Sequence, residues 1–330
     1  MFIIEHYPLA VAVCFLTMLC WGSWANTQKL ATQSVPTTIF YRDYAYGILL
    51  LALVLAFTLG SIGAAGRSFL TDLRQADPLH LLSTLAGGVV FNLANVLIVI
   101  GIQLVGLSVA MPVGIGLALI LGVLVNYLAS PVGNAAMLAF GVFFIFLAIV
   151  ASAMAQRLKG GAAQAVNARN LGLTLLGGFL MSFFFYFVSR AMAPDFAAPA
   201  PRLLTPYTAL VLFALGVVSS TPFLLPLLRR FTQKPGEETV AYGAVSGRNH
   251  LIGMLGGLVW CLGMASSLLA SGAAGYAISY GLGQGATIVA ALWGVFVWQE
   301  FRGAPPVANR WLGVMGVCYV IGLMMIIVAR

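Results

Sequence analysis

The chain has 330 residues, of which 61% are hydrophobic and 7% are charged. A water-soluble protein carries about 25% charged residues, so these figures exclude a soluble fold and predict an all-α polytopic membrane protein. The net charge of +8 comes from 16 basic residues that are dispersed along the chain, a pattern that argues against a nucleic-acid partner.

Apolar stretches long enough to cross a bilayer occur throughout the chain, since a spanning helix needs about 20 residues. The N-terminus lacks the basic segment of a cleaved signal peptide, so the first stretch is expected to be retained. Four cysteines lie inside apolar stretches without metal-ligand spacing, and no metal is expected. The stretches, ten in number, are 8–28, 39–63, 79–104, 107–129, 134–156, 170–192, 204–228, 249–271, 274–298 and 310–329.

The two halves of the chain resemble each other at an offset of 169 residues, which places the third stretch on the eighth and the fourth on the ninth. This predicts a five-helix repeat over 1–156, a short cytoplasmic linker at 157–169 and a second repeat over 170–330. Five is odd, so the copies are expected to be inverted, as in many secondary transporters. The residues that coincide are Gly87, Gly88, Val90, Leu93, Gly106, Gly114 and Gly116 with Gly256, Gly257, Val259, Leu262, Gly275, Gly283 and Gly285.

The basic residues predict the orientation of the chain. Loops after odd-numbered stretches contain 11 Lys and Arg, and the opposite side contains 5. By the positive-inside rule, both termini are expected to lie outside the cytoplasm.

Polar residues at the end of the first stretch form one candidate substrate site. Trp21, Trp24 and Gln28 follow at i, i+3 and i+7 and would share one face of a helix. Indoles beside an amide suit a flat polar ring, by stacking and hydrogen bonding. The alternative is an interfacial aromatic belt.

Amides in the middle of the third stretch form a second candidate. Asn92 and Asn95 are one turn apart at membrane depth, and Trp260 lies in the matching part of the eighth stretch. These amides either bind substrate or form interhelical hydrogen bonds.

A third candidate is a pair of interrupted helices in the fourth and ninth stretches. Proline and glycine free backbone groups at membrane depth, and paired interruptions point to a transport site. Close packing of small residues is the alternative. The predicted break or gating residues are Pro112, Gly114, Gly283 and Gly285, with Tyr280 and Gln284 as substrate ligands.

Two acids close to span ends, Asp43 and Glu300, are candidates for proton coupling. Each has an adjacent arginine, so a local ion pair is the alternative. The other acids close to the membrane, Glu5, Asp72, Asp77 and Asp195, are expected in loops.

Five segments carry a family resemblance, namely Trp21–Lys29, Phe40–Tyr44, Gly87–Gly88, Val105–Ser108 and Trp293–Arg302. They resemble the ureide permeases of the drug/metabolite transporter superfamily, which also includes bacterial glucose/ribose and rhamnose porters of ten-span design. The resemblance implies proton-coupled uptake of oxo derivatives of nitrogen heterocycles such as allantoin, uracil and xanthine. Plant members have a long loop with a Walker A-like sequence, whereas here the loop is only Arg157–Asn170 and has no such motif.

The sequence therefore predicts a secondary active importer of small neutral nitrogen-rich solutes, with no cofactor beyond an ion gradient, expected to be H⁺. No candidate nucleophile with a nearby base suggests an enzyme. A sugar porter is the close alternative, and a receptor or a bundle without transport is the distant one. The expected partners are a small-molecule substrate and the lipid bilayer of a bacterial inner membrane, as a monomer or homodimer.

Overall fold

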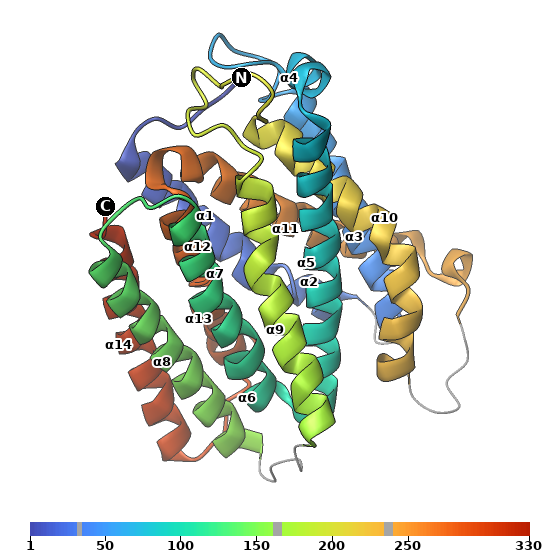
Figure 1. The fold of residues 1–330 in the computed structure, drawn as a ribbon. Helices are drawn as coiled ribbons and strands as arrows, with labels where there is room; N and C mark the ends of the chain where they lie inside the picture. Colours follow the sequence, from blue (N-terminus) through green and yellow to red (C-terminus); the bar gives the residue numbers. More distant parts are fainter. Residues whose placement is uncertain (32–34, 161–166, 234–239) are drawn as a thin grey trace.

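The computed structural model describes residues 1–31, 35–160, 167–233 and 240–330, which form a bundle of helices (Figure 1). Within these residues nine helices are long and apolar enough to cross a membrane, and a shorter apolar helix covers Val113–Ala129. Because the regular elements of the described chain are all helical, the protein is an all-α polytopic membrane protein, as its composition predicts.

The helices follow the predicted apolar stretches closely. The predicted linker 157–169 includes 161–166, which lie outside the described residues. In the first half the elements are α1 (Tyr7–Ser23), α2 (Asn26–Leu30), α3 (Thr37–Phe57), α4 (Phe69–Gln75), α5 (Pro78–Val105), α6 (Leu107–Ala110), a π-helix η1 (Met111–Ile115), α7 (Gly116–Ala129) and α8 (Ala135–Gly160). In the second half they are α9 (Ala168–Ser189), α10 (Pro206–Thr232), a short 3₁₀ helix η2 (Tyr242–Ala244), α11 (Gly247–Ala274), α12 (Tyr276–Gly283), α13 (Ala286–Leu292), a π-helix η3 (Trp293–Val297) and α14 (Pro306–Ile327).

The fourth and ninth predicted stretches are not continuous α-helices. The fourth passes from α6 through η1, which contains Pro112, into α7. The ninth passes from α12 through a turn at Gln284 and Gly285 into α13 and η3. Proline has no amide hydrogen to donate, and π-helical turns commonly mark functional positions within helices.

Two glycines end the long central helices of the two halves in the same way. Gly106 follows α5 with φ of 79°, and Gly275 follows α11 with φ of 87°. Glycine adopts this left-handed conformation without the steric cost of a side chain. The two residues are 169 positions apart, so the predicted equivalence of these segments extends to the backbone conformation.

Helices α5 and α10 cross at glycines in both directions. A Cβ atom on Gly88 would lie 2.1 Å from the Phe213 carbonyl oxygen, and one on Gly216 would lie 2.1 Å from the Leu85 carbonyl oxygen. Only glycine permits backbones to approach this closely, and small residues are the usual means of helix packing in membranes.

Helices α3 and α11 cross in the same manner. A Cβ atom on Gly257 would lie 2.0 Å from the Tyr44 carbonyl oxygen, and one on Gly47 would lie 2.1 Å from the Met254 carbonyl oxygen. Each of these four residues is 169 positions from its counterpart in the other crossing. Each crossing therefore joins one helix of the first half to one helix of the second half, and the two crossings are equivalent under the sequence offset.

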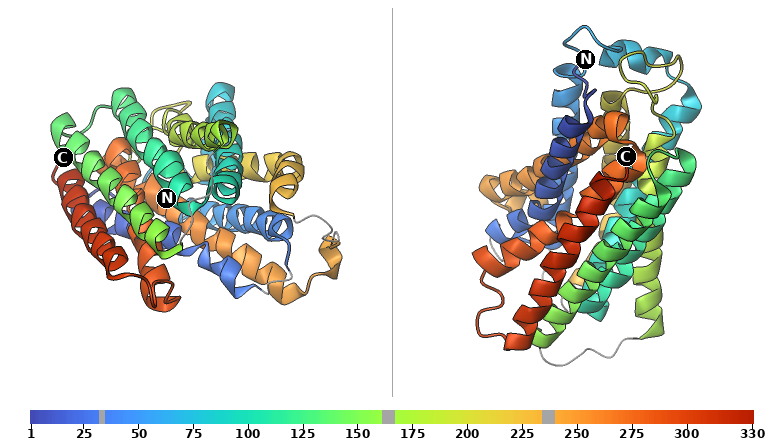
Figure 2. Two further views of the ribbon diagram at one scale, coloured as in Figure 1. Left: turned by 90° about the horizontal axis from the view of Figure 1, so that it is seen from below. Right: turned by 90° about the vertical axis from the view of Figure 1, so that its left-hand side faces the viewer.

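Both termini lie at the same end of the bundle, which is at the top of Figure 1 together with α4. The Met1 amino group donates to the Ala65 carbonyl at 2.6 Å, and the Tyr7 hydroxyl donates to the Ile327 carbonyl near the other terminus. Figure 2 shows α14 (red) alongside α8 (light green).

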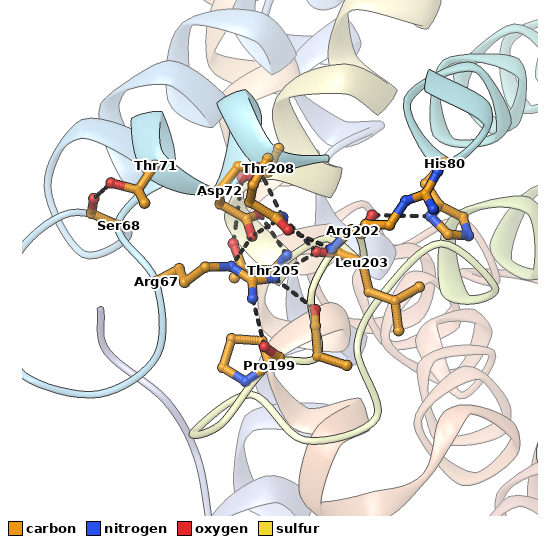
Figure 3. A network of polar contacts seen from close by, with 12 residues as sticks. Arg67, Ser68, Thr71, Asp72, His80, Pro199, Arg202, Leu203, Thr205 and Thr208 are labelled. Carbon is orange, nitrogen blue, oxygen red and sulfur yellow. Dashed lines mark hydrogen bonds and ion pairs between the residues drawn. The ribbon is translucent and has the colours of Figure 1, made fainter. Parts of the chain in front are cut away.

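A polar network joins α4 to the segment before α10 at this end (Figure 3). Asp72 is fully buried on α4, which differs from its predicted loop position, and it accepts hydrogen bonds from Arg67 Nε at 2.9 Å and from the Thr205 amide at 2.7 Å. The Arg67 guanidinium also donates to the Pro199 and Leu203 carbonyls. These partners compensate the buried carboxylate, which would otherwise be costly.

Candidate functional site

A cluster of aromatic rings lies where the two halves of the protein meet, with Trp260 at its centre. Its ring centroid is 4.4 Å from Phe91, 5.7 Å from Phe213, 5.8 Å from Trp21 and 6.4 Å from Tyr44. Offset and edge contacts at such distances are favourable for aromatic pairs. We call Trp21, Trp24, Tyr44, Phe91, Phe213 and Trp260 the central aromatic cluster.

The cluster follows the internal repeat. Phe91 and Trp260, which are in contact, are 169 positions apart, as are Tyr44 and Phe213. Phe91 and Trp260 both lie halfway along the longest helices, α5 and α11. The cluster therefore lies midway along these helices, and four of its six rings come from equivalent positions of the two halves.

The two tryptophans of the first predicted site join this cluster from the end of α1. Trp21 donates from Nε1 to the Trp260 carbonyl at 3.3 Å, and the Trp24 ring lies 4.7 Å from that of Tyr44. Two glycines make room for the Trp21 ring, because a Cβ atom on Gly263 or Gly283 would lie 2.6 or 2.8 Å from it. Gly283, predicted as a break residue, thus shapes the space around the cluster.

A buried polar network adjoins the cluster. Asn92 is fully buried; its Oδ1 accepts from the Tyr41 hydroxyl at 2.8 Å, and its Nδ2 donates to the Val217 carbonyl at 3.0 Å and to Ser220 Oγ at 2.8 Å. Asn95 donates to the same Tyr41 hydroxyl at 3.0 Å. The Asn92 amide is occupied by partners on α3 and α10, which favours the interhelical alternative for this residue.

The other predicted substrate ligands lie apart from the cluster. Gln28 is exposed on α2, and Gln284 is half-buried in the turn after α12. Tyr280 is fully buried, and its hydroxyl donates to the Ala118 carbonyl on α7 at 3.1 Å. Its ring contacts Phe184, which in turn contacts Phe91 of the cluster.

Gly114 and Gly285, two of the remaining break residues, lie at close contacts between helices. Gly114 lies in η1, where its carbonyl oxygen would be 2.4 Å from a Cβ atom on Gly178 of α9. Gly285 follows α12 and faces Met18 of α1, with only 2.7 Å between its Cβ position and the Met18 methyl group. Pro112 lies in η1 beside Gly114. The interruptions are thus packed against α9 and α1, the equivalent outer neighbours of α5 and α11.

Asp43 is a buried acid at the end of the bundle opposite the termini, covered by a tyrosine and a histidine. It is 1% exposed; Oδ2 lies 2.7 Å from His250 Nδ1, and Oδ1 accepts a hydrogen bond from the Tyr242 hydroxyl. Burial raises the pKa of Tyr242 to about 12, and its hydrogen bond to Asp43 acts in the same direction, so the phenol remains a donor. Arg42 stacks on the Tyr242 ring instead of pairing with Asp43.

Glu300 has a different setting, between two lysines. Its carboxylate lies 2.6 Å from Lys29 Nζ and 3.3 Å from Lys159 Nζ, and Arg302 pairs with Gln299 instead. The Lys29 hydrogen bond, supported by Lys159, lowers the pKa of Glu300. Glu300 therefore holds the ends of α2, α8 and η3 together as a charged group.

Several residues of this site were not predicted as ligands. Tyr44, Phe213 and Phe91 belong to the cluster, and Tyr242 and His250 surround Asp43. The repeat offset could have found the first three, because it maps Trp260 onto Phe91 and Phe213 onto Tyr44. Nothing in the sequence pattern pairs His250 with Asp43.

Metal-ligating side chains do not gather in the described ranges: no group of three or more His, Cys, Asp or Glu could hold a metal ion there. The candidate site is instead made of rings, amides and hydroxyls. Such groups recognise flat or polar neutral ligands by stacking and hydrogen bonding.

Comparison with solved structures concerns the fold. A crystal structure that is 15% identical in sequence aligns with 96% of this chain and 96% of its own, with a TM-score of 0.64. At this identity the likeness shows a shared fold across nearly the whole chain.

The sequence was also compared with protein families and with individual relatives, and the family match lies between residues 40 and 169. Residues 40–169 match the family model described as Ureide permease. Ureide permease 1 of Arabidopsis thaliana is 32% identical over 129 residues, which are 38% of this chain and 33% of that protein. Ureide permease 2 is 30% identical over 155 residues (46% and 39%), and Ureide permease 4 is 29% identical over 177 residues (52% and 42%), both from the same plant. The chain thus spans less than half the length of these relatives. The resemblance to the ureide permease family that the sequence motifs indicate is confirmed over residues 40–169.

Proposed function

We propose that this protein is a secondary active membrane transporter that imports small neutral nitrogen-rich solutes, namely ureides such as allantoin or nucleobases such as uracil and xanthine. The observation that carries the proposal is the central aromatic cluster, which lies halfway along α5 and α11 and contains two pairs of equivalent positions from the two halves. The matched relatives are named ureide permeases, which supports the substrate class.

The chemistry of the cluster suits this cargo. A ureide or nucleobase offers a flat face for stacking and an edge of carbonyl and N–H groups for hydrogen bonds. The side chains around Trp260 are rings, and the adjacent network contributes the Asn95 amide, which is half-buried. The cluster itself contains no charged side chain, which favours neutral solutes over ionic ones.

Alternating access between two inverted five-helix repeats is the proposed mechanism. It is supported by the equivalent glycine crossings of α5 with α10 and of α3 with α11, which make the interface between the halves alike on both sides of the cluster. Inverted repeats of this kind rock about a site at their boundary. The protein is placed in a bacterial inner membrane. If its basic loops face the cytoplasm, the end that holds the termini and α4 faces away from the cytoplasm.

Proton coupling is assigned to Asp43. Its carboxylate is buried beside an imidazole and a phenol, so a proton that it gains or loses changes the contacts between α3, η2 and α11. Glu300 is the weaker candidate, because two lysines hold it in its charged form.

A ligand screen tests the proposed function. Purified protein is heated with allantoin, uracil, xanthine or hexoses, since a ligand of the native state raises the melting temperature by mass action. Allantoin or a nucleobase is expected to stabilise the protein, and stabilisation by hexoses alone would contradict the proposal.

An uptake assay in proteoliposomes tests the coupling. An inward proton gradient should drive accumulation by the wild type and by Glu300→Gln, whereas Asp43→Asn should lose accumulation and retain exchange of labelled for unlabelled substrate. Full accumulation by Asp43→Asn would remove Asp43 from the coupling step.

A further inference from the structure

The hydroxyl group of Tyr44 differs from the other buried hydroxyls around the cluster. Tyr44 is fully buried, and among the residues that the structure describes its Oη has no hydrogen-bond partner. By contrast, the Tyr41 hydroxyl donates to Asn92 at 2.8 Å and accepts from Asn95 at 3.0 Å. Buried polar groups are nearly always paired, and an exception calls for a physical explanation.

Packing does not explain this hydroxyl. The equivalent position in the second half, 169 residues later, is Phe213. Phe213 stacks on Trp260 at 5.7 Å and lies 5.4 Å from Phe91, much as Tyr44 lies 6.4 Å from Trp260. The same place in the fold is therefore filled by a ring without a hydroxyl, so the cluster does not require one for its packing.

The surroundings of Tyr44 are those of a binding group. Its ring lies 4.7 Å from Trp24 and 5.6 Å from Tyr41, and its carbonyl oxygen marks the close crossing with Gly257 of α11. The side chain thus belongs to the boundary between the halves and is shielded from lipid. An unpaired donor at such a boundary costs free energy in the protein alone and recovers it when a ligand supplies an acceptor.

We propose that Tyr44 Oη is a substrate contact, donating a hydrogen bond to a ring carbonyl oxygen of a flat neutral ureide or nucleobase that stacks on the rings of the central aromatic cluster. This inference rests on the proposed function. A neutral phenol has one O–H to donate, and a ring carbonyl is the strongest acceptor that such a solute presents.

The first test compares Tyr44→Phe with Tyr207→Phe. Tyr207 is also buried, but its hydroxyl donates to the Phe2 carbonyl at 3.1 Å, beside the N-terminus. Without ligand, Tyr44→Phe should unfold at the same temperature as the wild type or higher, and Tyr207→Phe at a lower one. Calorimetric titration should show the Kd of allantoin or uracil raised about tenfold in Tyr44→Phe, the usual effect of one hydrogen bond, and unchanged in Tyr207→Phe.

The second test identifies the acceptor. In 2-thiouracil and 4-thiouracil a sulfur atom, which is a weak acceptor, replaces one carbonyl oxygen. The wild type should bind one of these analogues about tenfold more weakly than uracil, and Tyr44→Phe should not discriminate against it.

The outcomes separate the inference from the function on which it rests. A wild-type Kd in Tyr44→Phe overturns the role of Tyr44 and leaves the transporter proposal in place. A loss of stability in Tyr44→Phe as large as in Tyr207→Phe means that the hydroxyl has a protein partner, which also overturns it. If the wild type binds neither allantoin nor uracil, the proposed function fails and the inference with it.

Discussion

Adding a methyl group at the glycine crossings tests whether the two halves meet as the structure describes. The perturbations are Gly257→Ala and Gly88→Ala, whose new Cβ atoms would lie 2.0 and 2.1 Å from the carbonyl oxygens of Tyr44 and Phe213. Real Cβ contacts essentially never fall below 3.0 Å, so each pair of helices must separate by about 1 Å. The obstacle is backbone on both sides, and it cannot rotate away.

Overpacking of this kind costs about 1–3 kcal/mol, and we expect both variants to fall in the upper part of that range. The control variant is Gly313→Ala on α14, because no atom lies within 4 Å of its Cβ position. Alanine is a better helix former than glycine by about 1 kcal/mol, so this variant should match or exceed the wild type.

Thermal and denaturant unfolding in detergent measure these differences. The two crossing variants should be destabilised to a similar degree, since their sites are equivalent under the 169-residue offset. If either one unfolds like Gly313→Ala, the close crossing is refuted. If they differ by more than about 1.4 kcal/mol, a tenfold change in the equilibrium constant, the equivalence of the two crossings is refuted.

Three further predictions concern polar groups. Asp72→Ala should lower stability by about 3–5 kcal/mol because it removes one partner of a buried charge pair; Asp72→Asn, which still offers an oxygen to the Thr205 amide, should cost less in the same unfolding assay, and equal costs would contradict this account. Asn92→Ala should lose about 1–2 kcal/mol of stability, because it removes several interhelical hydrogen bonds that are each worth about 0.6 kcal/mol on average in a membrane; a variant as stable as the wild type would count against the interhelical role. For Glu300 the pKa is below its ordinary 4.5 because Lys29 donates a hydrogen bond to it, so its stabilisation is complete above that pH and is lost as the pH falls through the lower folded value. Glu300→Gln should therefore differ from the wild type by a constant amount of about 1 kcal/mol or less near neutral pH, and the difference should vanish only in acid; a difference that disappears near pH 6 would refute the lysine contacts.

The pattern of the sequence determined the helices and their interruptions. Apolar runs with charged or Gly/Pro-rich breaks predicted the spans, because a bilayer accepts only backbone whose hydrogen bonds are satisfied internally. The glycine register at offset 169 also held information about tertiary structure, since Gly88 and Gly257 mark equivalent crossings. In both cases the signal is local or repeated within the chain.

Only the tertiary structure decided which polar groups meet. Asp43 and Glu300 look alike in the sequence, each within two residues of an arginine, yet one contacts His250 and the other contacts Lys29 and Lys159. Lipid tails are as apolar as a protein core, so the apolar residues of a spanning helix do not reveal which face packs against a neighbour. The partners of a side chain therefore depend on how helices far apart in the chain cross, which is why the unpaired hydroxyl of Tyr44 became visible only in the folded protein.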